Sequence, residues 1–250
     1  MANLALHGID APHIWHGNTL TGMAFHGALF ADAPALYDVV LTNPPFGGKE
    51  SKDAQANFPY KTGATQVLFL QHVIEALAEG GTCGIVMDEG VLFRTNETAF
   101  LQTKRKLLDE CDLFCIVSLP PGVFMNAGAA SKTNLLFFKK GRSTERIWYY
   151  DLSDVKVTKR NPLTLAQFDD FFVRLSLAPR EPGRESERSW WTDIQDIRAR
   201  SYDLKAVNPN RKPAGDTRTP AELLAVIEEK QAQIVEAVAA LREIMAEPSP

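Results

Sequence analysis

The fold is decided by Tyr37-Asp38-Val39-Val40-Leu41-Thr42-Asn43-Pro44-Pro45-Phe46, an apolar run that meets an abrupt turn. Residues 37–42 predict a buried strand. The prolines behind them predict its immediate end, because proline cannot donate to a sheet ladder. In an open parallel α/β sheet, ligands bind beyond the carboxyl ends of the strands. The Asn43-Pro44-Pro45-Phe46 motif therefore lies where such a fold places its site.

Short apolar runs alternate with amphipathic stretches on the downstream side of this motif. Helices are expected over residues 64–78, where Gly80-Gly81 would end the helix, and over residues 97–110. Further strands are expected at residues 83–87, 113–119, 133–138 and 146–150, with a turn at residues 120–124. This alternation predicts an α/β domain with a mostly parallel sheet.

The sequence changes character after Asp151. Residues 174–188 are charged and proline-rich, which predicts a linker or mobile loop, and Trp190-Trp191 is expected to open a short helix. We therefore divide the chain into an α/β domain that carries the Asn-Pro-Pro-Phe motif (residues 1–150), an extension with a linker (151–218) and a terminal helix (219–247).

The terminal helix has a clear start signal. Thr219 can cap it, Pro220 suits the first helical position, and Glu222 completes a capping box. A heptad seam follows, in which Gln231 is the one polar member. Two interpretations stay open: a helix packed on its own domain, and a docking or coiled-coil helix for a partner. The apolar seam residues are Leu224, Ile227, Ile234, Val238, Leu241 and Met245.

Composition and charge narrow the classes of function. The net charge is −4 and the pI is about 5.8, whereas a protein that grips DNA alone usually shows a strong basic surface. No apolar run is long enough to span a bilayer, and the first ten residues do not resemble a secretory signal, so we expect a cytoplasmic protein.

Cysteine and histidine give no sign of a metal site. Three cysteines lack Cys-x-x-Cys spacing and are expected as small buried hydrophobes in a reducing compartment. Four histidines lie close in sequence without the spacing of metal ligands, so no metal is expected. The cysteines are Cys83, Cys111 and Cys115, and the histidines are His7, His13, His16 and His26.

The residue types of the motif fit one chemical task, the activation of an exocyclic amino group such as that of adenine. This nitrogen is a poor nucleophile because its lone pair is delocalised into the ring. The Asn43 side-chain oxygen and the Pro44 backbone carbonyl are two acceptors that could pull its hydrogens out of the ring plane. Pro44 and Pro45 restrict the backbone, and Phe46 can stack on a base swung out of a duplex. These four residues are the predicted catalytic residues.

Residues 38–47 resemble the catalytic motif of amino-methyltransferases. Further stretches are similar to the modification (M) subunit of type I restriction–modification systems, a family of N6-adenine DNA methyltransferases, in its C-terminal part only. These stretches are residues 3–9, Gly17-Asn18-Thr19-Leu20, 80–82, 90–93, 118–124, 133–138, Tyr202-Asp203-Leu204 and Asn208-Pro209.

The resemblance implies methyl transfer from S-adenosylmethionine to a flipped adenine in DNA. It places Asn18 against the adenine of the donor, although Asn18 also fits a plain turn residue. It implies that the terminal helix docks on a specificity subunit, which would choose the DNA sequence, with a restriction subunit as a further partner.

The chain also departs from this family. A glycine-rich loop after the first strand and an acidic residue after the second are not found. We therefore expect an incomplete Rossmann-like methyltransferase sheet that lacks its first strands, with a C-terminal helical extension. Residues 37–42 would then present an unpaired apolar edge. The chain alone would fold poorly, aggregate or need a complementing N-terminal half, and a misplaced start or a broken gene would explain this.

Two alternative functions stay open. One is a non-catalytic remnant that binds a specificity subunit, which the missing donor loop favours. The other is methylation of a protein glutamine or an RNA base, because such enzymes also use Asn-Pro-Pro-aromatic loops on planar nitrogens.

Overall fold

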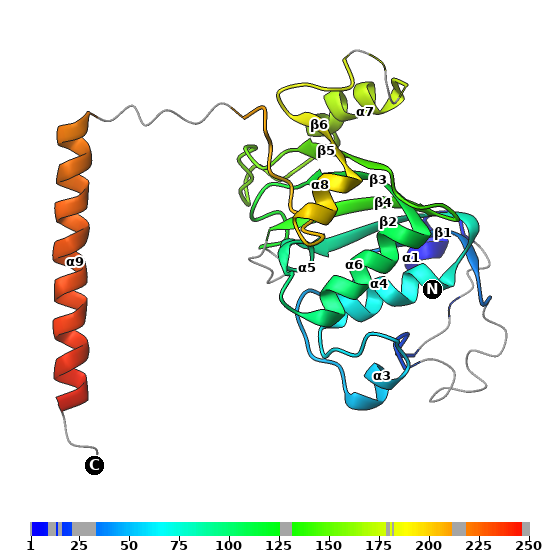
Figure 1. Cartoon of the computed structure of the whole chain (residues 1–250), viewed down its shortest axis with the longest axis horizontal. Coiled ribbons are helices and arrows are strands. Elements are labelled where there is room, and N and C mark those ends of the chain that lie inside the picture. The colour runs from blue at the N-terminus through cyan, green and yellow to red at the C-terminus, as the bar shows by residue number, and fades with distance from the viewer. Residues whose placement is uncertain are drawn as a thin grey trace. The chain divides into compact units, whose positions relative to one another are not determined.

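The computed structural model describes residues 2–9, 14, 17–21, 34–125, 132–178, 181, 183–211 and 219–246 (Figure 1). They form two compact units, Met1–Arg211 and Lys212–Pro250. His13, His16 and His26 lie outside the described residues.

The first unit is built on a six-stranded sheet in the order β1-β2-β4-β3-β5-β6. The strands β1 and β2 are parallel, as are β3 and β5, whereas β4 runs antiparallel to β2 and β3, and β6 runs antiparallel to β5. The strands are β1 (Tyr37–Thr42), β2 (Leu77–Asp88), β3 (Cys111–Ser118), β4 (Thr133–Lys140), β5 (Arg146–Asp151) and β6 (Ser189–Asp193).

The α/β class is confirmed, but the expected mostly parallel sheet is wrong because β4 and β6 run against their neighbours. The physical reason lies in the connection between β3 and β4. The described residues that follow β3 open with Leu-Pro-Pro-Gly and form a turn, and β4 then pairs antiparallel with β3.

Helices cover the sheet on both faces. On one face, α4 (Thr65–Ala76) and α6 (Thr98–Glu110) pack on a core that includes Ile85 and Leu136. On the other face, α7 (Asp169–Ser176) contributes Phe171 to a second cluster with Trp148 and Tyr150. The shorter helices are α1 (Ala2–Leu6), α3 (Lys52–Ala56), α5 (Glu89–Phe93), α8 (Ile194–Ala199) and the 3-10 helix η3 (Leu165–Phe168).

The Gly80-Gly81 pair belongs to β2, and the prediction that it ends the preceding helix is wrong. The helix α4 ends earlier, at Ala76. Gly80 has a φ of +77°, and a Cβ on Gly81 would lie 2.8 Å from the Ala78 carbonyl oxygen. The register between β1 and β2 shifts at this point, so the glycines shape an irregular strand rather than a helix end.

The expectation of a helix at Trp190-Trp191 is also wrong, because both residues lie in β6. Alternation along the strand sends Trp190 to the first core and Trp191 to the second. Trp190 stacks on Tyr149 of β5 with 5.2 Å between the ring centroids. The short helix α8 begins only after Asp193, whose carboxylate accepts a bond from the Gln195 N–H.

Residues 174–188 were expected as a linker or mobile loop, but Arg184 fixes their described part to the sheet. The Arg184 side chain is buried, lies 4.6 Å over the Trp148 ring, and donates to the carbonyls of Leu175 and Leu177. The Trp148 indole N–H donates in return to the Arg184 carbonyl at 3.2 Å. This segment is therefore packed structure.

The second unit contains α9 (Pro220–Ala246), as expected. Its capping box is confirmed, because the Glu222 N–H donates to Thr219 Oγ1 at 3.3 Å and the Thr219 N–H donates to Glu222 Oε2 at 2.6 Å. The apolar seam side chains of Leu224, Ile227, Ile234 and Val238 are 41–63% exposed. The side chains of Leu241 and Met245 lie outside the described part of the chain. Among the described residues, no helix is long and apolar enough to cross a membrane.

Candidate active site

The Asn43-Pro44-Pro45-Phe46 motif follows β1 directly, at the carboxyl end of the strand. Asn43 and Pro45 are exposed, Pro44 is buried, and Phe46 is half-buried. An exposed amide beside a buried, fixed proline leaves the Asn43 side chain accessible to a ligand. The four residues that the sequence singled out thus form one loop at this end of β1.

The Pro44 carbonyl is held by Gln66, which the sequence reasoning missed. The Gln66 amide nitrogen donates to the Pro44 oxygen at 3.5 Å, and its amide oxygen accepts from the Asp88 N–H at 2.9 Å. The backbone N–H of Asp88 can only donate, so the amide oxygen of Gln66 must face it. The amide nitrogen of Gln66 therefore faces the Pro44 carbonyl. Gln66 is 4% exposed and links the ends of β1 and β2. A glutamine on an otherwise apolar helix face was the available signal.

An aromatic pair stands beside these acceptors. The rings of Phe46 and Phe124 lie 5.1 Å apart, centroid to centroid, at an angle of 49°. Phe124 comes from the turn that follows β3. Sequence reasoning had placed that turn without linking it to the site. The two rings contact each other and form one aromatic surface, on which a flat, amine-bearing ring could stack.

Glycines return the site loop to α4. Gly47 and Gly48 have φ angles of +70° and +90°, and a Cβ on Gly48 would lie 2.9 Å from Thr65 Oγ1. The Thr65 hydroxyl donates to the Glu50 carboxylate at 2.8 Å, and Lys49 forms a bridge with Ala64. These contacts fix both ends of the segment between Lys49 and Thr65, which contains α3.

Asn18, which is expected to contact the adenine of the methyl donor S-adenosylmethionine, lies in a turn beside α3. Its side-chain oxygen accepts from the Leu20 N–H at 3.0 Å, and the Asn57 amide donates to the carbonyls of Leu20 and Thr21 at 3.1 Å each. Among the described residues, no glycine-rich turn follows a strand except Gly47-Gly48 in the site loop.

No group of three or more potential metal ligands occurs in the part of the chain that the structure describes. The described cysteines are buried and unbridged. Burial raises the pKa of the Cys83 and Cys111 thiols to about 12, which keeps both protonated at neutral pH. They have the character of packing residues rather than nucleophiles.

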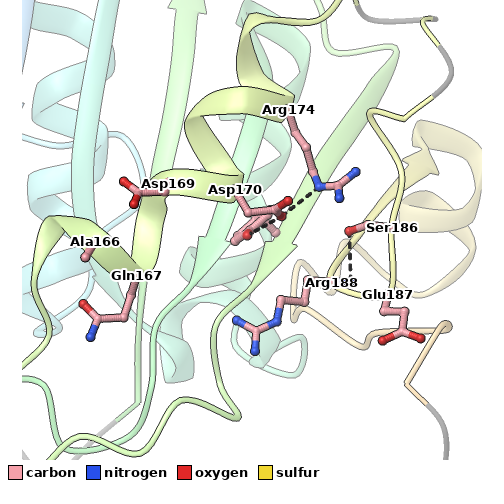
Figure 2. Close-up of a pocket in the computed structure, with 9 residues that line it drawn as sticks. Ala166, Gln167, Asp169, Asp170, Arg174, Ser186, Glu187 and Arg188 are labelled. Carbon is pink, nitrogen blue, oxygen red and sulfur yellow. Dashed lines mark hydrogen bonds and ion pairs between the residues drawn. The ribbon is translucent and has the colours of Figure 1, made fainter.

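A separate cavity of about 500 Å³ lies between α7 and the strand end of β5 (Figure 2). The Asp170 carboxylate accepts from the Tyr150 hydroxyl at 2.8 Å and from Arg174 Nε at 2.7 Å. Arg174 therefore holds the pKa of Asp170 below its usual value. Arg188 on the opposite wall is paired with Asp154. Asp170 and Arg188 in this lining are therefore each engaged in an ion pair.

Residues 1–216 match the family model described as N-6 DNA Methylase. The type I restriction enzyme EcoEI methylase subunit of Escherichia coli is 38% identical over an alignment of 263 positions. The alignment covers 97% of this chain and 49% of that protein. The StySPI methylase subunit of Salmonella potsdam is 33% identical over 182 residues, with 68% of this chain and 33% of that protein covered.

Solved structures agree with these matches. One is a structure from work on the complex assembly and conformational transition of the type I R-M system. It has a TM-score of 0.73 and 37% identity, and the match covers 99% of this chain and 52% of that chain. The EcoKI M protein has a TM-score of 0.67 and 26% identity, with 99% and 57% covered. The chain thus spans about half the length of the relatives it matches.

Proposed function

Because the chain belongs to the N-6 DNA methylase family, we propose that it supplies the adenine-holding part of a type I restriction–modification methyltransferase subunit. The observation that carries this proposal is the exposed Asn43 amide at the carboxyl end of β1, beside a Pro44 carbonyl that Gln66 holds. The reaction is transfer of a methyl group to the N6 nitrogen of adenine.

The chemistry of this site follows from its acceptors. A flipped adenine would present two N–H groups, one to the Asn43 side-chain oxygen and one to the Pro44 carbonyl. Acceptors outside the ring plane favour a tetrahedral nitrogen with a free lone pair, and their fixed positions lower the cost of reorganisation. Phe46 and Phe124 would replace part of the stacking that the base loses on leaving the duplex.

S-adenosylmethionine is the proposed donor and supplies the methyl group. Asn18 remains a proposed contact for its adenine, because the turn that holds Asn18 is fixed to α3 by Asn57. One side chain does not make a donor site, so the residues of this chain are assigned only the binding and orientation of the target base.

Partners are proposed for the steps that the chain does not perform. A specificity subunit would choose the DNA sequence and anchor the complex to it, since the chain has a net charge of −4. The exposed seam of α9 is the proposed docking surface for that subunit, and a restriction subunit is a further proposed partner. The cytoplasm is the proposed location, because the proposed substrate is DNA.

The test is methyl transfer to duplex DNA by Asn43→Ala. The chain is assayed alone and together with a specificity subunit and the upstream half of the E. coli relative. We expect a roughly ten- to thousand-fold loss of turnover, since one transition-state hydrogen bond is removed. The control is Asn96→Ala, which removes another exposed asparagine and should leave the rate unchanged. Wild-type turnover in Asn43→Ala would refute the role of Asn43.

A non-catalytic role is the second candidate, because α9 belongs to a compact unit of its own. Calorimetry separates the two roles. Binding of S-adenosylmethionine by the complemented protein supports the enzyme. Binding of a specificity subunit without any donor binding or methyl transfer supports the partner-binding role. Transfer to RNA or to a protein glutamine, but not to DNA, would change the substrate class.

A further inference from the structure

A short hairpin follows β5 and presents two cations at its tip. The Thr158 N–H donates to the Asn161 carbonyl at 3.0 Å, and the Asn161 N–H donates back to the Thr158 carbonyl at 3.1 Å. Lys159 and Arg160 form the two-residue turn between them. We call residues 155–163 the basic hairpin.

The basic hairpin is ordered by its own contacts and by the core. Val155 and Leu163, at its two ends, pack against the cluster around Trp148. The Asn161 amide donates to the Lys156 carbonyl at 3.4 Å, and the Asn161 N–H also reaches the Thr158 hydroxyl at 3.1 Å. A ligand at the tip would therefore meet a backbone that needs little further ordering.

The cations of the basic hairpin are exposed and lack acidic partners. Within the described part of the chain, no carboxylate forms an ion pair with Lys156, Lys159 or Arg160. Several other cations are paired, for example Arg105 with Asp109 at 3.3 Å. The basic hairpin thus adds local positive charge, which no described carboxylate neutralises, to a chain of net charge −4.

The strand directions bring the basic hairpin to the same sheet edge as Asn43. The strand β1 is parallel to β2, and β4 is antiparallel to both β2 and β3, so β2 and β3 point the same way. The strand β5 is parallel to β3. The carboxyl ends of β1 and β5 therefore lie on one edge, four strand spacings or roughly 19 Å apart.

We propose that the basic hairpin binds the phosphate backbone of the duplex whose adenine enters the Asn43 site. The proposal rests on the proposed function and names a second place where this chain holds the same substrate. The two strand ends from which the site loop and the basic hairpin extend are roughly 19 Å apart, about half a turn of B-DNA, and duplex DNA carries one charge per roughly 1.7 Å of its axis. A duplex that delivers a base at β1 thus offers phosphates within reach of Lys159 and Arg160.

The test is the salt dependence of duplex binding by the 250-residue chain, measured by fluorescence anisotropy between roughly 50 and 200 mM salt. Loss of two phosphate contacts in K159A/R160A should weaken binding about ten-fold at low salt. The slope of log affinity against log salt should become shallower by about two. The charge-keeping K159R/R160K should bind as the wild type does.

The matched control is R105A/K139A, which removes two exposed cations from α6 and from the far end of β4. Its affinity should stay within about two-fold of the wild type. Wild-type binding by K159A/R160A, an equal loss in the control, or no duplex binding by the wild-type chain would each overturn the proposal. Because no readout requires methyl transfer, failure of the basic hairpin is distinguishable from failure of Asn43.

Discussion

Gln66 shows how one buried side chain can decide the geometry of a site that it does not enter. It holds the Pro44 carbonyl at the end of β1 and takes its own orientation from the Asp88 N–H at the end of β2. A carbonyl oxygen has two lone pairs, so the bond from Gln66 leaves room for a second donor. Gln66 is thus a positioning residue for the proposed acceptor.

Two substitutions at Gln66 separate its two bonds. Gln66→Glu keeps an acceptor for the Asp88 N–H but removes the donor to Pro44, whereas Gln66→Met removes both. We expect turnover to fall about ten-fold in both variants with little change in KM for DNA, because the acceptor is misplaced. Melting temperature should fall in both variants, because Gln66→Met leaves the Asp88 N–H unpaired and Gln66→Glu buries a carboxylate beside the Pro44 carbonyl. Full turnover in Gln66→Met would contradict the positioning role.

The sequence predicted the site residues that are adjacent along the chain and missed those that the fold brings in. Asn43 to Phe46 carry their chemistry in one stretch behind an apolar strand. Gln66 and Phe124 reach the same place from a helix and from a later turn. Their contacts depend on strand order, which residue types and spacing do not specify.

At the scale of elements, Lys104 ties α6 to α5. Its buried ammonium donates to the carbonyls of Leu92 and Arg94 at 2.7 and 2.8 Å, which satisfies the end of α5. Burial lowers the pKa of Lys104 from its ordinary value of 10.5 to about 8. Lys104 therefore couples stability to pH.

The sign of this coupling can be measured. Between pH 8 and 10.5 the unfolded chain keeps the Lys104 proton while the folded chain has lost it, so this group makes the folded state more stable as pH rises. The difference in unfolding free energy between wild type and Lys104→Met should grow on the order of 1–3 kcal/mol across that window. Urea denaturation at several pH values measures it.

The control for this experiment is Lys139→Met, at an exposed lysine, for which the same difference should stay flat. Cys83 and Cys111 also titrate in alkali, but they are present in both proteins and cancel in the difference. A flat difference in Lys104→Met would show that the buried amine keeps its ordinary pKa.

The helix α9 gives a prediction about partner binding. Ile227 and Ile234 are exposed on the apolar seam of a separate unit. I227D/I234D should weaken binding to a specificity subunit by at least ten-fold, because the interface would bury two charges, while the first unit melts as before. Surface plasmon resonance measures the binding. Q233D, on the polar side of the same helix, should bind normally, and equal losses in both variants would point to helix unfolding instead.

Element type was largely predictable from the sequence, whereas element direction was not. The periodicity of residues 97–110 and the cap at Thr219 gave helices close to those observed, α6 and α9. The reversal of β4 and the strand character of Trp190-Trp191 depend on pairing with β3 and β5. Such pairing is a tertiary effect that overrides local propensity.

At the scale of the whole molecule, the edge of the sheet at β1 determines how the chain behaves by itself. Among the described strands β1 pairs only with β2. Val39 and Leu41 on this strand are 63% and 79% exposed. An apolar strand with unpaired backbone groups is a template for association, so we expect the chain alone to self-associate at micromolar concentration.

Light scattering after size-exclusion chromatography tests this expectation. V39K/L41K should shift the chain towards monomer, because charges on an edge strand oppose pairing. The control L165K/V173K changes two apolar residues of η3 and α7 that are about as exposed as Val39 and Leu41. It should associate as the wild type does. A wild-type chain that is monodisperse and melts cooperatively as a monomer would contradict the role given to this edge.

The reversed strand β4 has a consequence for how this protein can diverge. Because β4 runs antiparallel to β3, the residues between these strands connect them at the sheet edge that carries Asn43, and Phe124 lies in the described part of this connection. Doubling the length of such a connection costs only about 0.6 kcal/mol in closure entropy. Insertions there can change the aromatic surface beside Phe46 while the strand pairing of β3 and β4 stays intact, so the shape of the base-holding site can vary in evolution at little cost in stability.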